Sequence, residues 1–181
     1  MVYVFLADGF EEMEALSPVD ILLRAGVEVT TVGITGEYVT GAHGIIVKSD
    51  AADFEMNECT EMIVLPGGGR GTANLSASEK VRNAIEYAKK HNVKMAAICA
   101  APSVLGENGV LVGRRAACFP EPMFTDKLKG AEYVSDGVCA DNGVVTARSA
   151  GHAVNFGIEL VRQLKGDDAA EKIRVELFQN A

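Results

Sequence analysis

The sequence predicts an α/β protein built on a doubly wound, mostly parallel sheet with helices on both faces. Apolar runs without strict polar alternation are typical of strands covered on both faces, and four occur, at Val2–Ala7, Val27–Ile34, Met62–Leu65 and Met95–Ile98. Helical segments lie between them, and this alternation is characteristic of doubly wound folds. A chain of 181 residues can bury a substantial core.

Four segments carry helical signals, because apolar residues recur at helical spacing and glycine or basic residues close most of them. They are residues 11–25, the segment ending at Lys89-Lys90-His91, residues 151–164 and, with the weakest pattern, residues 167–178. Pro18 lies inside the first, so we expect that helix to restart or bend there. Ser76 and Glu79 have the spacing of a capping box and predict the start of the second.

Two further segments predict β-hairpins. Residues 38–48 form two short β-prone stretches around Gly41–Gly44, and we expect this hairpin to lie off the main sheet. Residues 138–147 contain Asp141-Asn142-Gly143, a strong tight-turn signal between two β-prone stretches. Because no repeat, linker or low-complexity segment interrupts the chain, we expect residues 1–181 to form one domain.

Composition and charge exclude several functions. The net charge is −8 and no local Lys/Arg cluster interrupts it, which argues against nucleic-acid binding. The N-terminus lacks a basic signal-peptide region, and no run reaches the roughly 18 apolar residues of a membrane span.

The chain has four cysteines, Cys59, Cys99, Cys118 and Cys139. Their irregular spacing fits neither a metal motif nor a disulfide scaffold, so we expect a reduced cytoplasmic setting. Three isolated histidines and no cofactor motif predict neither metal nor cofactor.

Cys99 ends an apolar strand and precedes Ala-Ala-Pro-Ser-Val-Leu, which starts a helix. A residue at such a turn stands at the carboxyl edge of the sheet, where open α/β folds bind ligands. Backbone N–H groups and a helix N-terminus beside the sulfur would lower the thiol pKa and hold an oxyanion. This run alone supports two interpretations: a nucleophile elbow with Cys in place of Ser, or a small buried apolar residue.

The acidic run that opens the first helix contains Glu11, Glu12 and Glu14. The helix dipole alone favours acids in a first turn. Because each residue turns a helix by about 100°, Glu14 lies on a different face from Glu11 and Glu12 and could point inward. An inward Glu14 would need a partner or a raised pKa. Beside a thiolate, its protonated form would donate a hydrogen bond and later shuttle a proton.

A glycine-rich segment, Leu65-Pro-Gly-Gly-Gly-Arg-Gly71, follows the third strand. It lacks the Gly-Lys-Ser/Thr ending of a phosphate-binding loop. Its glycines would either let the backbone approach a ligand with its amides turned inward, or form a plain flexible turn, which is the simpler interpretation.

Several motifs in order give the chain its resemblance to a known family. They are Glu11-Glu-Met-Glu14, Ser17-Pro-Val-Asp20, Arg24-Ala-Gly26, Val64-Leu-Pro-Gly-Gly68, Ala96-Ala-Ile-Cys-Ala-Ala-Pro102 and Thr146-Ala-Arg148. Together they resemble the ThiJ/PfpI superfamily, whose domain is of the class I glutamine amidotransferase-like type. The match is strongest to its parkinsonism-associated deglycase branch, which includes bacterial YajL-type members, and it covers almost the whole chain.

The resemblance implies a flavodoxin-like three-layer sandwich that forms a homodimer. It places the reactive cysteine on Cys99, its glutamate partner on Glu14, and the amides flanking the sulfur on Gly68 and Ala100. Supporting roles are expected for Arg24, His43 and Arg148.

Two departures narrow the implied chemistry. Protease-like members carry His directly after the cysteine, where this chain has Ala100, so a Cys–His dyad and peptidase activity are not expected. A histidine found in part of the deglycase branch is replaced by Phe119, as in YajL-type members. Glu14 is therefore left as the main proton shuttle.

The function implied by the resemblance is cofactor-independent detoxification of a small reactive aldehyde, methylglyoxal, or of its glycated adducts, with a role in the stress response. The alternative is an oxidative-stress sensor or holdase chaperone with an oxidisable cysteine. The ThiJ name also suggests thiazole monophosphate biosynthesis. This biosynthetic function ranks low because the sequence offers no basic site that would bind a phosphate group.

Overall fold

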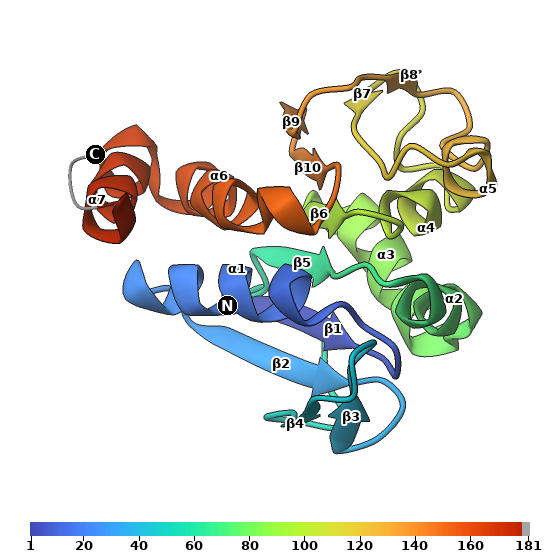
Figure 1. Cartoon of the computed structure of the whole chain (residues 1–181), viewed down its shortest axis with the longest axis horizontal. Coiled ribbons are helices and arrows are strands. Elements are labelled where there is room, and N and C mark those ends of the chain that lie inside the picture. Colours follow the sequence, from blue (N-terminus) through green and yellow to red (C-terminus); the bar gives the residue numbers. More distant parts are fainter. Residues whose placement is uncertain (179–181) are drawn as a thin grey trace.

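The computed structural model describes residues 1–178 and is centred on a six-stranded sheet in the order β2-β1-β5-β6-β10-β9 (Figure 1). The strands are β1 (Val2–Leu6), β2 (Val29–Gly33), β5 (Met62–Leu65), β6 (Lys94–Ile98), β9 (Val138–Asp141) and β10 (Val144–Ala147). The first five in this order are parallel, and β9 runs antiparallel at the edge. The parallel strands follow the order of flavodoxin-like folds, which confirms the predicted fold class.

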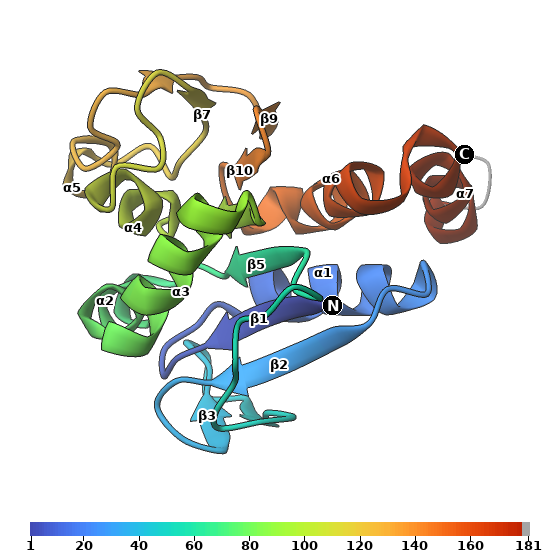
Figure 2. The same cartoon turned by 180° about the vertical axis from the view of Figure 1, so that it is seen from behind.

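Helices cover both faces of the sheet, as Figures 1 and 2 show. On one face lie α1 (Glu12–Arg24) and α6 (Ala153–Lys165), with α7 (Asp167–Phe178) packed on α6. On the other lie α2 (Gly69–Ala77), α3 (Glu79–His91) and α4 (Pro102–Glu107). Successive β1 side chains enter opposite cores: Phe5 packs under α3, whereas Val4 and Leu6 pack under α1 and α6.

Both predicted hairpins are confirmed. β3 (Tyr38–Thr40) and β4 (Ile46–Lys48) pair antiparallel in a small sheet of their own. β9 and β10 also pair antiparallel, and the turn between them places Asn142 at φ 47° and Gly143 at φ 81°. Two successive positive φ values are the signature of the tight turn that Asn-Gly favours.

Two details of the predicted helices differ from the structure. α1 is continuous through Pro18 and neither stops nor restarts there; Gly157 of α6 lies against Pro18, since an added Cβ would come within 3.1 Å of its Cα. The capping box at Ser76 is wrong because Ser76 lies inside α2. The cap of α3 is Ser78, whose backbone is extended and whose Oγ accepts the N–H of Val81 at 3.4 Å.

The glycine-rich segment is more ordered than a flexible turn, because α2 begins at Gly69. Three short elements carry no periodic signal and were not predicted: β7 (Arg115–Ala116), α5 (Pro122–Thr125) and β8 (Glu132–Tyr133). A one-turn 3₁₀ helix (Ala150–His152) precedes α6. Within residues 1–178, every helix is too short or too polar to cross a membrane.

Candidate active site

Cys99 lies at the end of β6 in a left-handed backbone conformation, with φ 63°. A residue other than glycine in this region costs roughly 1–3 kcal/mol and persists only where its surroundings hold it. Here the Cys99 N–H donates to the carbonyl of Ala147 at 2.8 Å. The Cys99 carbonyl accepts from the N–H of Phe119 at 2.8 Å and from Sγ of Cys118 at 3.1 Å. Cys99 thus occupies an elbow geometry that its neighbours fix on both sides.

Glu14 is completely buried on α1 and turned toward Cys99. Its Oε2 accepts the backbone N–H of Gly67 at 3.0 Å. Within the described residues, Oε1 has no partner that meets the geometry of a hydrogen bond. A buried carboxyl oxygen without a partner is costly, so Oε1 is available to exchange a proton with the thiol or with a substrate.

Gly67 separates the two reactive side chains and was not singled out by the sequence. A Cβ added at this position would overlap Oε2 of Glu14 and lie 2.7 Å from Cβ of Cys99. The next residue, Gly68, has φ 86°, and the backbone amides of Gly68 and Ala100 beside the sulfur act to lower the pKa of the Cys99 thiol. The absence of a side chain at Gly67 is what allows Glu14 and Cys99 to meet.

Burial raises the pKa of Glu14 to about 7, and the charge of Glu11 adds to this effect. The Cys99 thiol beside the carboxyl and the hydrogen bond from the Gly67 N–H oppose this rise. The pKa of the Cys99 thiol is also raised, first by burial and then by the nearby Glu14 carboxylate, despite the amides of Gly68 and Ala100. The sequence-based expectation of a lowered thiol pKa is therefore wrong, because desolvation and a neighbouring negative charge outweigh the amide dipoles.

The three acids of the first turn serve different purposes. Glu11 caps α1, its Oε2 accepting the N–H of Glu14 at 2.8 Å. Glu12 is buried and accepts the backbone N–H of His43 at 2.8 Å, and its Oε2 lies 2.7 Å from Nδ1 of the same residue. Burial acts to raise the pKa of Glu12, but these hydrogen bonds outweigh it and leave the pKa lowered. Only Glu14 therefore remains available to the thiol.

The family assignment rests on comparison with known proteins. The family model described as the DJ-1/PfpI family matches residues 1–163. The chain belongs to this family. It is 32% identical over 181 residues to a Parkinson disease protein 7 homolog of Danio rerio, covering 97% of this chain and 95% of that protein. A deglycase of Pyrococcus abyssi is 33% identical over 168 residues, covering 91% and 99% of the two chains.

Solved structures show the same relationship. Oxidized DJ-1 of Toxoplasma gondii superposes with a TM-score of 0.89 at 32% identity, covering 98% of this chain and 97% of that one. DJ-1beta of Drosophila melanogaster gives a TM-score of 0.87 at 30% identity, with 98% and 96% coverage. The DJ-1/PfpI fold therefore extends over nearly the whole chain.

The supporting residues expected in this DJ-1/PfpI protein do not gather around Cys99. Arg24 pairs with Asp20 at 2.7 Å and with Glu176 at 3.3 Å; it lies ten residues beyond Glu14, or about 15 Å along α1. His43 is 72% exposed and bound to Glu12. Arg148 follows β10 and donates to the carbonyl of Ser135 at 3.3 Å. Within residues 1–178, none of the three hydrogen-bonds Glu14 or the thiol of Cys99, so their supporting roles stay predictions.

Cys118 and Phe119 contribute to the DJ-1/PfpI site through contacts with the Cys99 backbone that the sequence did not reveal. Both hydrogen-bond the Cys99 carbonyl. The Phe119 ring packs edge-on against Phe124, with the ring centroids 6.4 Å apart. A phenyl ring has no proton to exchange, so the Phe119 side chain can take no part in proton transfer.

Glu11, Glu12 and His43 also bring potential metal-ligand atoms within 4.8 Å of one another, although no metal site was predicted. The Glu12 carboxylate already receives two hydrogen bonds from His43. The cluster is thus accounted for by contacts within the protein.

Proposed function

We propose that this protein is a cofactor-independent, cysteine-dependent enzyme that detoxifies reactive carbonyls. It acts as a glyoxalase or deglycase on methylglyoxal or on its adducts with amines and thiols, and serves the stress response. The observation that carries this proposal is the pairing of Cys99, in a strained elbow, with a buried Glu14 whose pKa is raised to about 7. A general acid–base is most effective when its pKa lies near the working pH.

In the proposed reaction, the sulfur of Cys99 attacks the aldehyde carbon of methylglyoxal and forms a C–S bond. Glu14 takes the thiol proton, and the N–H groups of Gly68 and Ala100 stabilise the negative oxygen, which then receives that proton and becomes a hydroxyl. Glu14 next removes the proton from the carbon bonded to sulfur and returns it to the neighbouring carbon through an enediol. Water hydrolyses the resulting thioester, releasing lactate and restoring the thiol.

The raised thiol pKa fits a nucleophile that is deprotonated only during the attack. Burial and the Glu14 carboxylate disfavour a standing thiolate. The same carboxylate is the base placed to accept the proton when substrate arrives. The Glu14 carboxylate thus disfavours a thiolate in the resting site and accepts the thiol proton during the attack. This arrangement favours reaction with bound substrate over reaction of the thiol with other electrophiles.

A lactate-production assay with methylglyoxal tests this proposal. The Cys99→Ser variant is expected to fall to the uncatalysed background, and Glu14→Gln to lose about 10²–10⁴ in kcat/KM, the usual worth of general acid–base catalysis. Cys59→Ser is the matched control because Cys59 is an exposed cysteine outside the site. Unchanged methylglyoxal consumption by Cys99→Ser would refute the mechanism.

An oxidative-stress sensor is the second candidate function. The thiol of Cys99 is only partly buried, and the amides of Gly68 and Ala100 that reach its sulfur would also receive the oxygens of a sulfinate. One similar solved protein is described as oxidized. Intact-mass spectrometry after mild peroxide separates the candidates: selective gain of two oxygens at Cys99 supports sensing, and no oxidation there counts against it. Holdase activity that survives Cys99→Ser would instead indicate a chaperone surface.

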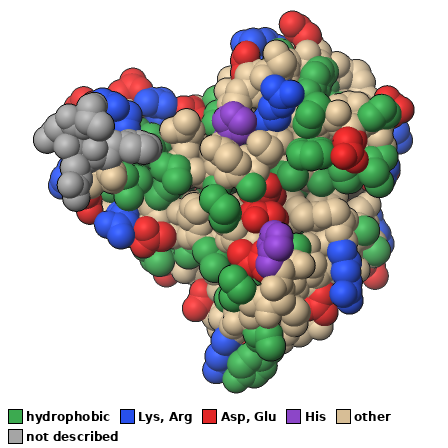
Figure 3. All heavy atoms as spheres, in the orientation of Figure 1, with side chains coloured by type: hydrophobic (Ala, Val, Ile, Leu, Met, Phe, Trp, Pro, Cys, Tyr) green, Lys and Arg blue, Asp and Glu red, His purple; other side chains and the backbone are tan. Residues whose placement is uncertain are grey.

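We further propose that the protein acts as a homodimer in the cytoplasm. Hydrophobic side chains lie over α1 and the β3–β4 hairpin on the face in Figure 3, and Met13, Leu23 and Ile46 are each more than half exposed. A second copy would cover the same patch on both chains through a two-fold axis. The described cysteines are all free, as expected in a reducing compartment. Light scattering of the wild-type protein is expected to give twice the mass of one chain. The Leu23→Arg variant is expected to give the mass of a single chain.

A further inference from the structure

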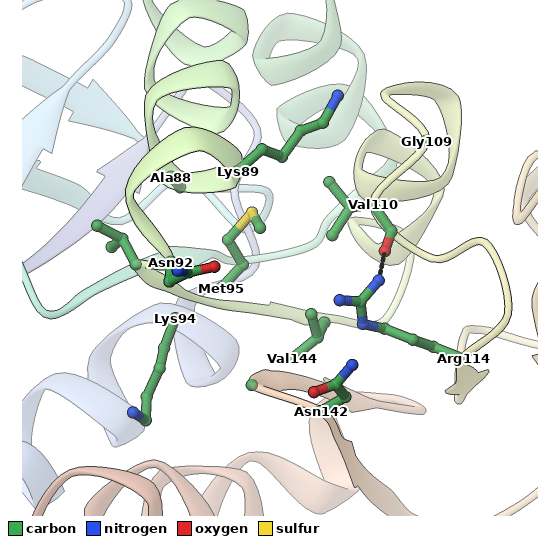
Figure 4. A pocket seen from close by; sticks show the side chains of 12 residues that line it. Ala88, Lys89, Asn92, Lys94, Met95, Gly109, Val110, Arg114, Asn142 and Val144 are labelled. Atoms are coloured by element: carbon green, nitrogen blue, oxygen red, sulfur yellow. Dashed lines mark hydrogen bonds between the residues drawn. The ribbon is translucent and has the colours of Figure 1, made fainter.

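A cavity lies at the edge of the sheet opposite to Cys99. It has a volume of about 550 Å³, within the usual range for small-molecule sites. The end of α3, the start of β6 and the β9–β10 turn contribute to its wall (Figure 4). β6 begins in this cavity with Lys94 and Met95 and ends before Cys99. At about 3.3 Å per strand residue, Met95 and Cys99 are roughly 13 Å apart, so the two sites are separate.

The guanidinium of Arg114 lies in the wall of this cavity. In Figure 4 its guanidinium extends between Val110 and Val144. Nη1 donates to the carbonyl of Val110 at 2.6 Å. Nε is buried without a hydrogen-bond partner, and within residues 1–178 no carboxylate lies within ion-pair distance of this guanidinium. A buried donor without an acceptor in the protein points to a bound water or ligand as its partner, or to stored strain.

The charged side chains that line the cavity are all basic. Lys89 and Lys94 stand at its rim with their amines directed away from Arg114 in Figure 4, and none of the lining residues is Asp or Glu. Lys89 is partly neutralised by Glu86 at 2.8 Å. These cations come from separate segments of a chain whose net charge is −8. A local positive potential in such a protein attracts anions to this cavity.

The rest of the lining suits a small organic body. Met95 and Val144 are buried and form an apolar floor. Asn92 and Asn142 add side-chain amides to the wall. Apolar surface with a few convergent polar groups is the usual composition of a small-molecule site.

We propose that this cavity binds a small organic oxyanion, a carboxylate or a phosphate monoester, with its charged group on the Arg114 guanidinium and its apolar part on Met95 and Val144. An Arg fork matches the oxygens of either group. Nη1 is already occupied by Val110, so the anion is bound by Nη2 and, after a small rotation of the guanidinium, by Nε. The site is independent of the reaction proposed at Cys99.

The test is an NMR titration of the ¹⁵N-labelled full chain with phenyl phosphate, benzoate and neutral benzyl alcohol. Saturable shifts are expected at the amides of Gly109 and Gly143 with at least one of the two anions and not with benzyl alcohol. Response to both anions identifies a general oxyanion site. Response to one assigns the site to phosphate or to carboxylate ligands.

Two variants of adjacent arginines provide the decisive comparison. Arg114→Gln is expected to weaken binding at least about ten-fold. Arg115→Gln makes the same change in charge, but Arg115 pairs with Asp136 on the surface, so affinity should be unchanged. Arg114→Lys keeps the positive charge but loses the forked guanidinium, so its affinity for the anion should lie between those of the other two variants. It also serves as the test if Arg114→Gln does not fold.

The proposal is overturned if no anion gives saturable shifts below about 10 mM, a limit that corresponds to very weak binding. It is also overturned if the Arg114 and Arg115 variants bind equally well. Cys99→Ser should keep full affinity for the anion, so this result does not depend on whether the lactate assay succeeds.

Discussion

The backbone N–H of Gly67 donates a 3.0 Å hydrogen bond to Oε2 of Glu14. This carboxyl oxygen overlaps the position that the Cβ of any other residue at 67 would occupy. This contact ties the glycine-rich segment after β5 to the first turn of α1. It fixes the carboxyl orientation and leaves room for the thiol of Cys99 beside it. The geometry of the Cys–Glu pair therefore depends on a residue that takes no part in the chemistry.

We expect Gly67→Ala to lower kcat/KM for methylglyoxal by about 10²-fold or more, because a misplacement of about 1 Å is enough for such a loss. The added Cβ would overlap the Glu14 carboxyl and crowd Cβ of Cys99. Gly69→Ala is the matched control, since its Cβ would meet nothing within 4 Å at the start of α2. That variant should keep full activity and gain up to about 1 kcal/mol of stability. Equal activity in the two variants would contradict the role of Gly67.

The pH dependence of the reaction should report Glu14. Its pKa is raised to about 7, and the proposed mechanism needs its carboxylate to accept the thiol proton. The wild-type kcat/KM is therefore expected to rise with pH and to level off above an apparent pKa near 7. The residual activity of Glu14→Gln should lack this step. A step of the same size in the variant would assign it to another group.

Glu14 should also make the folded state less stable as the pH rises. Because its folded pKa of about 7 exceeds the reference value of 4.5, the folded chain binds more protons than the unfolded chain between these values. The free energy of unfolding therefore falls between about pH 4.5 and 7, by up to about 3 kcal/mol, and levels off above pH 7. The Tm of Glu14→Gln relative to wild type is expected to increase over this range. A constant difference would show that Glu14 is not shifted.

The reactivity of Cys99 should increase when Glu14 loses its charge. The Glu14 carboxylate raises the pKa of the thiol by Coulomb repulsion, so Glu14→Gln should alkylate faster with iodoacetamide at about pH 8. Mass spectrometry of the Cys99 peptide measures this rate, and exposed Cys59 provides the internal reference. Slower alkylation of Cys99 in the variant would mean that Glu14 activates the resting thiol instead.

A buried hydroxyl supports the segment that holds the Cys99 carbonyl. Thr146 is 1% exposed, and its Oγ1 accepts the N–H of Ala117 at 2.9 Å. Thr146→Val leaves that buried N–H without an acceptor and should lower the free energy of unfolding by about 1–3 kcal/mol in urea. Thr40→Val on exposed β3 is the control and should change stability by less than about 0.5 kcal/mol. A similar loss in both variants would refute the role of this hydrogen bond.

The pattern of residues within a segment was sufficient to predict its structure where that structure depends on the segment alone. The apolar runs became β1, β2, β5 and β6, and Asp141-Asn142-Gly143 became the β9–β10 turn. The short elements between residues 115 and 133 were missed because their pairing is long-range: β7 pairs with β8, and the N–H of Arg115 donates to the Asp141 carboxylate at 2.8 Å. No periodicity within such a segment reveals a partner elsewhere in the chain.

The sequence by itself determined the α/β fold class, the elbow position of Cys99 and the separation of Glu14 from its acidic neighbours, because strand pattern and helical rotation are local properties. Only the tertiary structure decided the direction in which the pKa values of Glu14 and Cys99 shift, since desolvation depends on every segment that packs around them. It likewise gathered Lys89, Lys94 and Arg114 around one cavity, although no cluster of basic residues is visible in the sequence. Charges that are distant along the chain act together only once folding brings them within a Debye length.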